Sequence, residues 1–405
     1  MGSEASAQQG RHESTERLAP APLELSVVIP CLNEADTIGI CVQKAQRALR
    51  ENGIAGEVVV GDNGSTDGSQ EIAIRHGARV VDVPAKGYGN ALMGGIASAR
   101  GRYVIMGDAD DSYDFLEIPR FIDKLREGFE LVQGCRLPSG GGRVLEGAMP
   151  FLHRWLGNPM FSAMARRWFG APIHDVYCGL RGFTKELYDR LDQRCTGMEF
   201  ATEMIIKSSL YRAKIAEVPI TLHPDGRKTH APHLKTFRDG WRTLRFFLMY
   251  CPRWLFLIPG SFLILLGLIG YAIAIPGATL GHLTFEGHTL VYASLAILCG
   301  YQSVLFAIFT TTFAVNEGLR PPSPGYTAFY RVMNLERGLI GGVLAAIAGA
   351  ALLAVAVNKW RLTGFGHLDY SRTMRWVVPG ATLMALGVQT IFSSFFVSIL
   401  GMKRR

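Results

Sequence analysis

The sequence predicts two parts: an α/β domain with a doubly wound sheet, followed by an α-helical transmembrane domain. In the first half of the chain, short apolar runs alternate with segments of helix length, and this alternation is typical of parallel sheets covered by helices. The second half contains four apolar segments, each of 20 residues or more, without Asp, Glu, Lys or Arg. Segments of this length can cross the apolar core of a bilayer as helices.

The expected domain boundaries follow from changes in composition along the chain. Residues 1–22 are polar, lack an apolar period and are expected to form a disordered tail. The α/β domain is expected at residues 23–232 and an amphipathic juxtamembrane helix at 233–253. The transmembrane domain then fills 254–405, with spans at 254–275, 289–314, 338–357 and 376–400.

Within the α/β domain, strands and helices are expected in alternation up to a fourth strand. The apolar runs predict strands at 25–30, 57–61, 79–83 and 103–106, and the segments between them predict helices at 35–51, 69–76 and 91–99. Further along, 215–220 reads as an edge strand and a helix begins near residue 198. Connected in this way, the strands should form a parallel sheet.

The overall charge is basic, with a net charge of +8 and a sequence pI of about 9.2. Basic residues beside membrane spans meet anionic lipid, which accounts for the excess, and the chain has no nucleic-acid-binding motif. The seven cysteines show no CxxC pair or metal-ligand spacing. They are expected to be reduced thiols of a cytoplasmic domain.

Four carboxylates crowd into seven positions directly after the strand expected at 103–106: Asp108, Asp110, Asp111 and Asp114. Open α/β sheets bind ligands at the carboxyl ends of their strands. Like charges this close repel one another unless a cation lies among them, and hard oxygen ligands suit Mg²⁺ or Mn²⁺. The alternative is a solvated acidic turn.

Two other turns carry polar residues suited to a nucleotide. Asp62 ends the second strand, where its carboxylate could accept a hydrogen bond from a base or form an Asx turn before Gly64. Lys86 and Gly87 begin a glycine-containing turn before a helix. Glycine lets a backbone approach a diphosphate, and a lysine neutralises part of its charge.

Together with Val27–Glu34 and Val132–Arg136, these motifs resemble the family-2 glycosyltransferases, specifically the branch that makes dolichyl- or polyprenyl-phosphate sugars. The resemblance covers residues 25–245. It implies a GT-A type fold that binds a nucleotide-diphospho-sugar, and it carries over onto this chain residue by residue. The implied nucleotide-sugar-binding residues are Pro30, Asn33, Glu34, Asp62, Lys86, Gly87, Asp108 and Ala109.

The resemblance also implies a metal site and an acceptor site. Mg²⁺ or Mn²⁺ would be held by Asp108, Asp110 and Ser112, with Asp110 as the main ligand. Relatives have Gln where this chain has Ser112, so Asp111 and Asp114 are alternative third ligands. The acceptor phosphate would be bound by Arg136, Arg154, Asn158 and Arg227. The predicted catalytic residues are Asp110, Arg136 and Arg154.

Two amphipathic segments, residues 149–169 and 234–248, combine large apolar side chains with arginines. Such helices lie in a membrane interface, although the first could instead be a buried core helix. The segment around Asp175 matches the Asp-x-x-Ser-Gly motif of relatives with Cys178 in place of Ser, and Asp175 could orient an arginine or a sugar hydroxyl.

These features predict inverting, metal-dependent transfer of a sugar to polyprenyl phosphate at the cytoplasmic face of a cell membrane. A phosphate monoester is already a good nucleophile at neutral pH, so no general base is required. The alternatives are a processive polysaccharide synthase, or a non-catalytic transporter or scaffold. The spans are also expected to join copies of the chain into a homo-oligomer, because helices rich in small residues pack closely.

Overall fold

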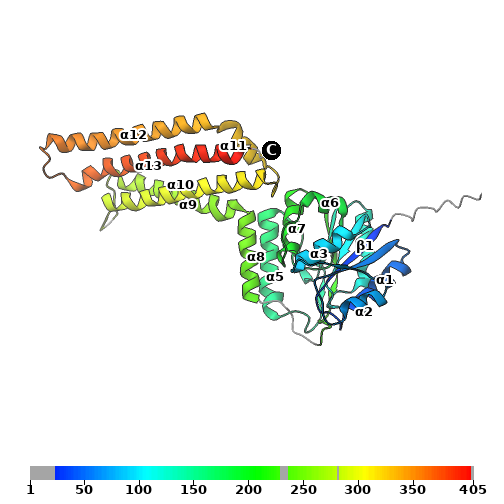
Figure 1. The fold of residues 1–405 in the computed structure, drawn as a ribbon. Helices are drawn as coiled ribbons and strands as arrows, with labels where there is room; N and C mark the ends of the chain where they lie inside the picture. The colour runs from blue at the N-terminus through cyan, green and yellow to red at the C-terminus, as the bar shows by residue number, and fades with distance from the viewer. Residues whose placement is uncertain (1–22, 229–235, 281, 403–405) are drawn as a thin grey trace, which may run out of the picture. The chain divides into compact units, whose positions relative to one another are not determined.

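The computed structural model describes residues 23–228, 236–280 and 282–402 (Figure 1). The tail expected at 1–22, the end of the basic loop at 229–235 and the last three residues lie outside these ranges. By packing, the chain divides into two units. The first contains Met1–Ala148, Cys178–Arg190 and Val218–Ala231, and the second contains Met149–Tyr177, Leu191–Glu217 and Pro232–Arg405. The functional boundary expected near residue 232 stays a prediction.

The first unit is built on a mixed sheet with the strand order β3-β2-β1-β4-β7-β5-β8. Four of the strands run parallel, as expected: β3 (Arg79–Asp82), β2 (Gly56–Asp62), β1 (Leu25–Cys31) and β4 (Tyr103–Met106). β7 (Arg181–Thr184) is antiparallel to both β4 and β5 (Leu131–Cys135). The parallel arrangement expected for the first four strands is confirmed, and β7 was not expected because Arg181–Thr184 is short and not an apolar run.

The remaining strands are short or lie at the edge of the sheet. β8 (Ile215–Pro219) ends the strand order, which confirms the expected edge strand. A separate parallel pair joins β6 (Arg143–Val144) to β9 (Thr221–Leu222). β1, β4 and β5 are buried along their whole length. For β4 this continuous burial is what its uninterrupted apolar run predicts.

Helices of the first unit pack on this sheet. α3 (Tyr88–Ser98) lies so close to β2 that a side-chain carbon on Gly61 would meet the carbonyl group of Ala91. α1 (Ile38–Glu51) packs against α2 (Ser69–Arg75) and α4 (Ile118–Arg126). α1 begins three residues later than expected because the backbone first makes a turn, in which the Thr37 N–H donates to the Glu34 carbonyl. A short 3₁₀ turn, η1 (Phe115–Glu117), precedes α4, another, η2 (Pro138–Gly140), follows β5, and α6 (Lys185–Leu191) follows β7.

The second unit is almost entirely helical. The segment expected to be amphipathic contains η3 (His153–Gly157), α5 (Asn158–Met164) and η4 (Ala165–Phe169). α7 (Glu199–Leu210) and α8 (Thr236–Tyr250) follow, the latter within the expected juxtamembrane helix. Among the described side chains of α8, Phe247 is fully buried, whereas Trp241 is 62% exposed. Trp241 therefore adds apolar surface outside the core of the unit.

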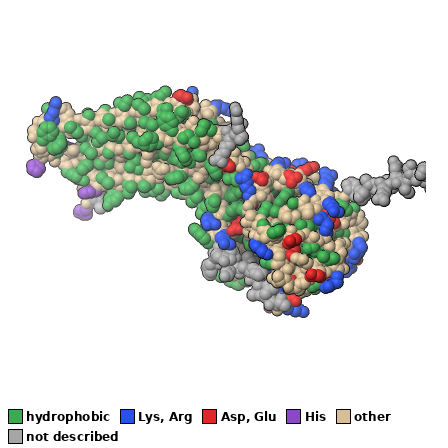
Figure 2. Space-filling model, in the orientation of Figure 1, with side chains coloured by type: hydrophobic (Ala, Val, Ile, Leu, Met, Phe, Trp, Pro, Cys, Tyr) green, Lys and Arg blue, Asp and Glu red, His purple; other side chains and the backbone are tan. Residues whose placement is uncertain are grey.

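Four helices are long and apolar enough to cross a membrane, which confirms the predicted spans: Arg253–Ala274, Gly287–Asn316, Leu335–Leu362 and Tyr370–Gly401. They comprise η5 (Arg253–Leu257) with α9 (Ile258–Ala274), and α10 (Gly287–Asn316), α12 (Leu335–Leu362) and α13 (Tyr370–Gly401). A hairpin of β10 (Thr279–Leu280) and β11 (Leu283–Thr284) joins α9 to α10, and α11 (Pro324–Val332) precedes α12. Figure 2 shows hydrophobic side chains spread over the visible face of this bundle, as lipid contact requires.

Small residues bring the helices of the bundle together. A side-chain carbon on Gly342 or Gly349 of α12 would lie 2.9 or 2.7 Å from the carbonyl oxygen of Gly387 or Gly380 on α13. Hydroxyl groups add interhelical hydrogen bonds, including Tyr271 with Ser294 at 2.6 Å. The glycines of α12 that the sequence marks for close packing therefore serve contacts within one chain, and the expected homo-oligomer stays a prediction.

Candidate active site

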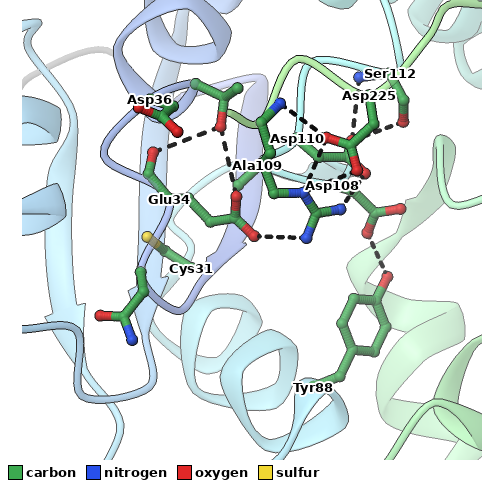
Figure 3. Close-up of polar contacts among 12 residues, drawn as sticks. Cys31, Glu34, Asp36, Tyr88, Asp108, Ala109, Asp110, Ser112 and Asp225 are labelled. Carbon is green, nitrogen blue, oxygen red and sulfur yellow. Dashed lines mark hydrogen bonds and ion pairs between the residues drawn. The ribbon is translucent and has the colours of Figure 1, made fainter. Parts of the chain in front are cut away.

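The predicted donor-site residues gather at the carboxyl ends of β1, β2 and β4, where open α/β sheets bind ligands (Figure 3). β4 ends at Met106, and the turn that follows carries Asp108 and Asp110. β1 ends at Cys31, three residues before Glu34. Parallel pairing of β1 with β4 thus brings together carboxylates that are more than seventy positions apart in the sequence.

Asp108 lies against Tyr88, the first residue of α3. The Tyr88 hydroxyl donates to Asp108 Oδ1 at 2.8 Å. Burial and, after it, the negative charge of Asp110 raise the pKa of Asp108 to about 6. A cation bound between the two carboxylates would relieve this repulsion, so the electrostatics of the turn favour a metal ion or another positive group.

Asp110 is the centre of the acidic turn. Its Oδ1 accepts from the Ser112 hydroxyl at 2.6 Å and from the Ser112 N–H at 3.1 Å. Its Oδ2 accepts from the Arg227 guanidinium at 2.9 Å. The backbone N–H of Gly226 donates to the Asp110 carbonyl at 2.9 Å. This bond fixes the loop at 225–228, which carries Arg227 and Lys228, against the acidic turn.

Arg227 lies among three carboxylates. Besides Asp110, its guanidinium pairs with Glu34 at 3.3 Å and with Asp225 at 2.9 Å, and only 11% of its side chain is exposed. The sequence assigns Arg227 to the acceptor phosphate, whereas here it neutralises the carboxylates of the predicted donor and metal site. The positive Arg227 guanidinium therefore lies at the place where a divalent cation is predicted to bind.

The two alternative third metal ligands are engaged elsewhere. Asp111 forms an ion pair with Lys44 of α1 at 2.8 Å, and its φ of 57° turns the backbone away from the regular strand direction. Asp114 accepts from the Leu116 N–H at 3.1 Å and so caps η1. In the described ranges there is no group of three or more His, Cys, Asp or Glu side chains placed to hold a metal ion.

The chemistry of the donors still fits a hard divalent cation. Asp108, Asp110 and Ser112 offer only oxygen atoms, and Mg²⁺ is commonly held by one or two carboxylates together with substrate phosphates and water. Two protein carboxylates on one turn satisfy that requirement. A third protein ligand is not needed where a diphosphate completes the coordination.

Asp62 is fully buried at the end of β2 and uses its two oxygens differently. Oδ2 accepts from the N–H groups of Gly64 and Ser65 at 2.9 and 3.0 Å and from Gln70 Nε2. This is the Asx turn that the sequence allowed. Oδ1 is buried and has no hydrogen-bond partner. A buried unpaired carboxylate oxygen is costly, and a donor N–H on a nucleotide base would satisfy it.

Asn63 builds the predicted phosphate-binding turn. Its Oδ1 accepts from the Gly87 N–H at 2.7 Å, and its carbonyl accepts from Lys86 Nζ at 2.6 Å. Its Nδ2 donates to the carbonyls of Val83 and Ala85 at 3.0 and 2.7 Å. Gly87 has φ of 132°, a conformation that L side chains rarely adopt. The turn is therefore held in place without any ligand.

Other predicted donor-site residues lie nearby in the same unit. Asn33 has φ of 58°, and its Oδ1 accepts from the Thr66 N–H at 2.9 Å. Pro30 is buried within β1, and the Ala109 carbonyl accepts from the Cys41 thiol at 3.4 Å. These contacts tie the turns after β1, β2 and β4 into one surface.

The predicted acceptor residues are divided between the two units. Arg136 is buried in the first unit and donates to the Tyr113 hydroxyl at 3.3 Å. Arg154 and Asn158 belong to the second unit, where Asn158 contacts Met149 Sδ at 3.2 Å. The Arg154 guanidinium lies 5.4 Å from the centre of the Trp155 ring, and its Nε is buried with no acceptor. Asp175, also in the second unit, accepts from the Tyr177 N–H.

Several residues of this site are missed by sequence reasoning. Tyr88 contacts Asp108, Tyr113 joins Arg136 to the Gly179 N–H, and Arg181 is fully buried on β7. Tyr88 lies inside the motif that was interpreted through its lysine and its glycines. A charged residue in an otherwise apolar strand was a usable signal for Arg181, because charges are seldom fully buried unless they are paired.

Comparison with known sequences decides the family. The family model for Glycosyl transferase family 2 matches residues 26–192. The family model for the Glycosyltransferase family 2 C-terminal transmembrane region matches residues 308–401. The low-salt glycan biosynthesis hexosyltransferase Agl6 of Haloferax volcanii is 36% identical over 93% of this chain and 89% of its own length. The chain belongs to glycosyltransferase family 2. It is a glycosyltransferase of the GT-A fold with a multi-pass helical membrane region, as the resemblance implied.

Two other similarities cover parts of the family-2 chain. A dolichyl-phosphate hexose transferase of Haloferax volcanii is 34% identical over 49% of this chain and 82% of its own. Among solved structures, glucosyl-3-phosphoglycerate synthase from Mycobacterium tuberculosis in complex with phosphoglyceric acid is 24% identical, with a TM-score of 0.46. That match covers 57% of this chain and 81% of the other.

Proposed function

We propose that this glycosyltransferase transfers a sugar from a nucleotide-diphospho-sugar to the phosphate of a membrane polyprenol, with inversion at the anomeric carbon. The observation that carries the donor half is the unpaired buried Oδ1 of Asp62 beside the preformed turn at Lys86 and Gly87. The acceptor half is supported by the four spans and by the name of one relative, a dolichyl-phosphate hexose transferase.

On the donor side, Asp62 accepts from the base while the turn after β3 receives the diphosphate. The backbone of Gly87 allows close approach, and Lys86 contributes positive charge. Asn33 and Glu34 complete the nucleotide surface from the turn after β1. These residues hold the donor so that its anomeric carbon faces the acceptor.

Asp108 and Asp110 would hold a Mg²⁺ or Mn²⁺ ion, with Ser112 beside it. When bound, the ion would stabilise negative charge on the departing nucleotide diphosphate. Tyr88 orients the Asp108 carboxylate through its hydroxyl, and Ser112 fixes the rotamer of Asp110. Binding of the ion requires Arg227 to leave Asp110 Oδ2, since both use the same oxygen.

On the acceptor side, the phosphate monoester of the polyprenol is the nucleophile. At neutral pH it is largely deprotonated, so no side chain has to remove a proton from it. Its oxygen attacks the anomeric carbon as the bond to the nucleotide diphosphate breaks, which inverts the configuration. Arg136, Arg154, Asn158 and the released Arg227 bind the phosphate oxygens, because guanidinium groups present forked donors to them.

The second unit supplies an apolar surface suited to a lipid acceptor. Phe151, Trp155 and Leu156, which flank Arg154, are 74%, 62% and 60% exposed. Large exposed apolar side chains next to arginines are typical of a helix in a membrane interface. The proposal sets this surface at the cytoplasmic face of the membrane, where nucleotide sugars are available.

The decisive experiment uses the purified full-length protein with a panel of nucleotide sugars and polyprenyl phosphate, and detects the sugar-linked lipid by mass spectrometry. We expect a product with at least one donor, its loss with excess EDTA, and near loss in Asp110→Ala. Asp123→Ala, which removes an exposed carboxylate of α4, is the matched control and should remain active. Full activity in excess chelator would refute the metal role, and sugar polymer without lipid product would favour a polysaccharide synthase.

A further inference from the structure

The Arg320 side chain of the helical unit has no role in the proposed sugar transfer. Arg320 follows α10, the second membrane span, and its Nε is buried without a hydrogen-bond acceptor. In the described part of the chain it forms no ion pair with an acidic side chain. Burial lowers the pKa of the Arg320 guanidinium, as expected for a charge removed from water without compensation.

The segment that carries Arg320 is held in place by the rest of the helical unit. The Arg194 guanidinium donates to the Glu317 carbonyl at 3.3 Å, and the Tyr211 hydroxyl donates to the Gly318 carbonyl at 3.1 Å. The Arg320 N–H itself donates to the Ala314 carbonyl at 3.2 Å, which closes the end of α10. The Arg320 Nε is therefore buried by a defined fold of this segment, while the side chain as a whole is half-buried.

A second arginine lies close to the same place. Cys251, at the end of α8, is buried, and the positive charges of both Arg320 and Arg253 act on its thiol. Arg253 is the first residue of the first membrane span and is exposed. Arg253 begins η5 and Arg320 follows α10, and these two elements pack against each other. In the described chain Arg320 forms no ion pair with a carboxylate. The end of α10 supplies a partial negative charge but no acceptor for the Arg320 Nε.

The depth of this pair in the membrane is indicated by its aromatic neighbours. Trp254, next to Arg253, stacks on Trp168 with ring centres 5.5 Å apart, and the Arg167 guanidinium lies 5.8 Å from the Trp254 ring. Tryptophans next to arginines at the end of a membrane span are typical of the head-group layer. The anions available at that depth are lipid phosphates.

We propose that Arg320, together with Arg253, binds the phosphate group of a membrane lipid at the end of the bundle where the first span begins and the second ends. The site takes a phosphate mono- or diester attached to an acyl or prenyl chain. The buried Arg320 Nε, which has no acceptor, distinguishes this half-buried arginine from the exposed arginines of the surface, since a partly desolvated guanidinium gains more from pairing. The proposal is independent of sugar transfer and is tested by binding alone.

The test uses the full-length protein in dodecyl maltoside, a detergent without phosphate, and measures thermal unfolding as lipid is added. The additives are phosphatidylglycerol, polyprenyl phosphate and inorganic phosphate, in separate titrations. Wild-type protein should be stabilised by at least one of the two lipids. A response to phosphatidylglycerol identifies a phospholipid site. A response confined to polyprenyl phosphate supports the proposal where Arg320→Met weakens it and overturns the proposal where Arg320→Met leaves it unchanged, because the proposed acceptor site binds the same lipid. A response to inorganic phosphate alone, or to none of the three, overturns the proposal.

Substitutions then assign the site. Arg320→Met keeps an unbranched apolar stem and removes a partly desolvated charge, so its stability in detergent alone should equal or exceed that of wild type. Its apparent dissociation constant for lipid should rise roughly ten- to a hundredfold, the factor that corresponds to one charge-assisted hydrogen bond. Arg331→Met, which removes an exposed arginine of α11, is the control and should bind lipid like wild type.

Equal weakening in Arg320→Met and Arg331→Met would mean that lipid responds only to total surface charge, and would overturn the proposal. If Arg320→Met does not fold, Arg320→Lys carries the test, because it keeps the charge and loses the fork. Lipid should still stabilise Arg320→Lys, but with lower affinity than wild type. Undiminished affinity in that variant would also contradict the site.

Discussion

Release of Arg227 is expected to limit metal binding in the absence of donor. The Arg227 guanidinium donates to Asp110 Oδ2 at 2.9 Å and pairs with Glu34 at 3.3 Å. The three side chains are only 11%, 16% and 10% exposed, so solvent screens these contacts weakly. A cation that binds Asp110 has to displace the guanidinium first. Arg227→Gln should therefore bind Mn²⁺ more tightly than wild type.

The magnitude follows from the contact that is lost. A hydrogen bond to a charged group contributes about 1.5–3 kcal/mol, and only the contact with Asp110 competes directly for the metal-binding oxygen. The dissociation constant for Mn²⁺ should fall roughly ten- to a hundredfold. The same change leaves Glu34 and Asp110 without their shared counter-ion, which adds to the attraction for a cation and lowers the stability of the metal-free protein.

Electron paramagnetic resonance of free Mn²⁺ measures this affinity without substrate. Lys228→Gln is the matched control, because it removes one positive charge from the neighbouring, exposed position, which has no ion pair with these carboxylates among the described contacts. Tighter binding in Arg227→Gln but not in Lys228→Gln would support displacement. Equal affinities in wild type and Arg227→Gln would refute it, because Arg227 would then leave Asp110 at no cost.

Three further outcomes are expected. Asp62→Asn should keep the Asx turn through its amide oxygen but present an N–H₂ group to the base. Donor binding measured by calorimetry should therefore weaken roughly tenfold or more. Unchanged donor affinity would remove Asp62 from the base site. Glu203→Gln should lower the free energy of unfolding by about 3–5 kcal/mol in thermal unfolding. Lys207, which pairs with Glu203 at 2.7 Å and is 1% exposed, would be left with an uncompensated buried charge. A loss below about 1 kcal/mol would contradict this. Arg154→Ala should raise the KM for polyprenyl phosphate roughly ten- to a hundredfold with little change for the nucleotide sugar, and equal effects on both would move Arg154 out of the acceptor site.

The strands and the membrane spans could be predicted because each depends on a local property of the sequence. β4 was expected at 103–106 and is found there, since four consecutive apolar residues before an acidic turn leave little choice. The spans were found because no charge interrupts them. The direction of β7 could not be predicted in this way. Its antiparallel pairing with β4 depends on the course of the chain through the second unit between the two strands. The residues of β7 themselves do not indicate that course.

The chemistry of the acidic turn could be predicted from the sequence, but the partner of Asp110 could not. Arg227 is 117 positions from Asp110 and 193 from Glu34, so their ion pairs depend on the complete fold. The role of Asp111 was equally hidden, because Lys44 lies on α1, 67 positions earlier. Sequence reasoning finds clusters of like residues along the chain. It does not find the opposite charges that the fold brings to them.

The division of the chain into two units places the proposed donor residues in one unit and divides the proposed acceptor residues between both. Every predicted nucleotide- and metal-binding residue belongs to the unit built on the sheet, whose turns are fixed without ligand. Arg154 and Asn158 belong to the unit that also contains the spans, and the loop after α10 is hydrogen-bonded to Arg194 and Tyr211 of that same unit. A change in the spans therefore acts within the unit that contains Arg154 and Asn158, and outside the unit that contains the predicted donor residues. Donor affinity should consequently be the more robust of the two properties when the membrane region is altered.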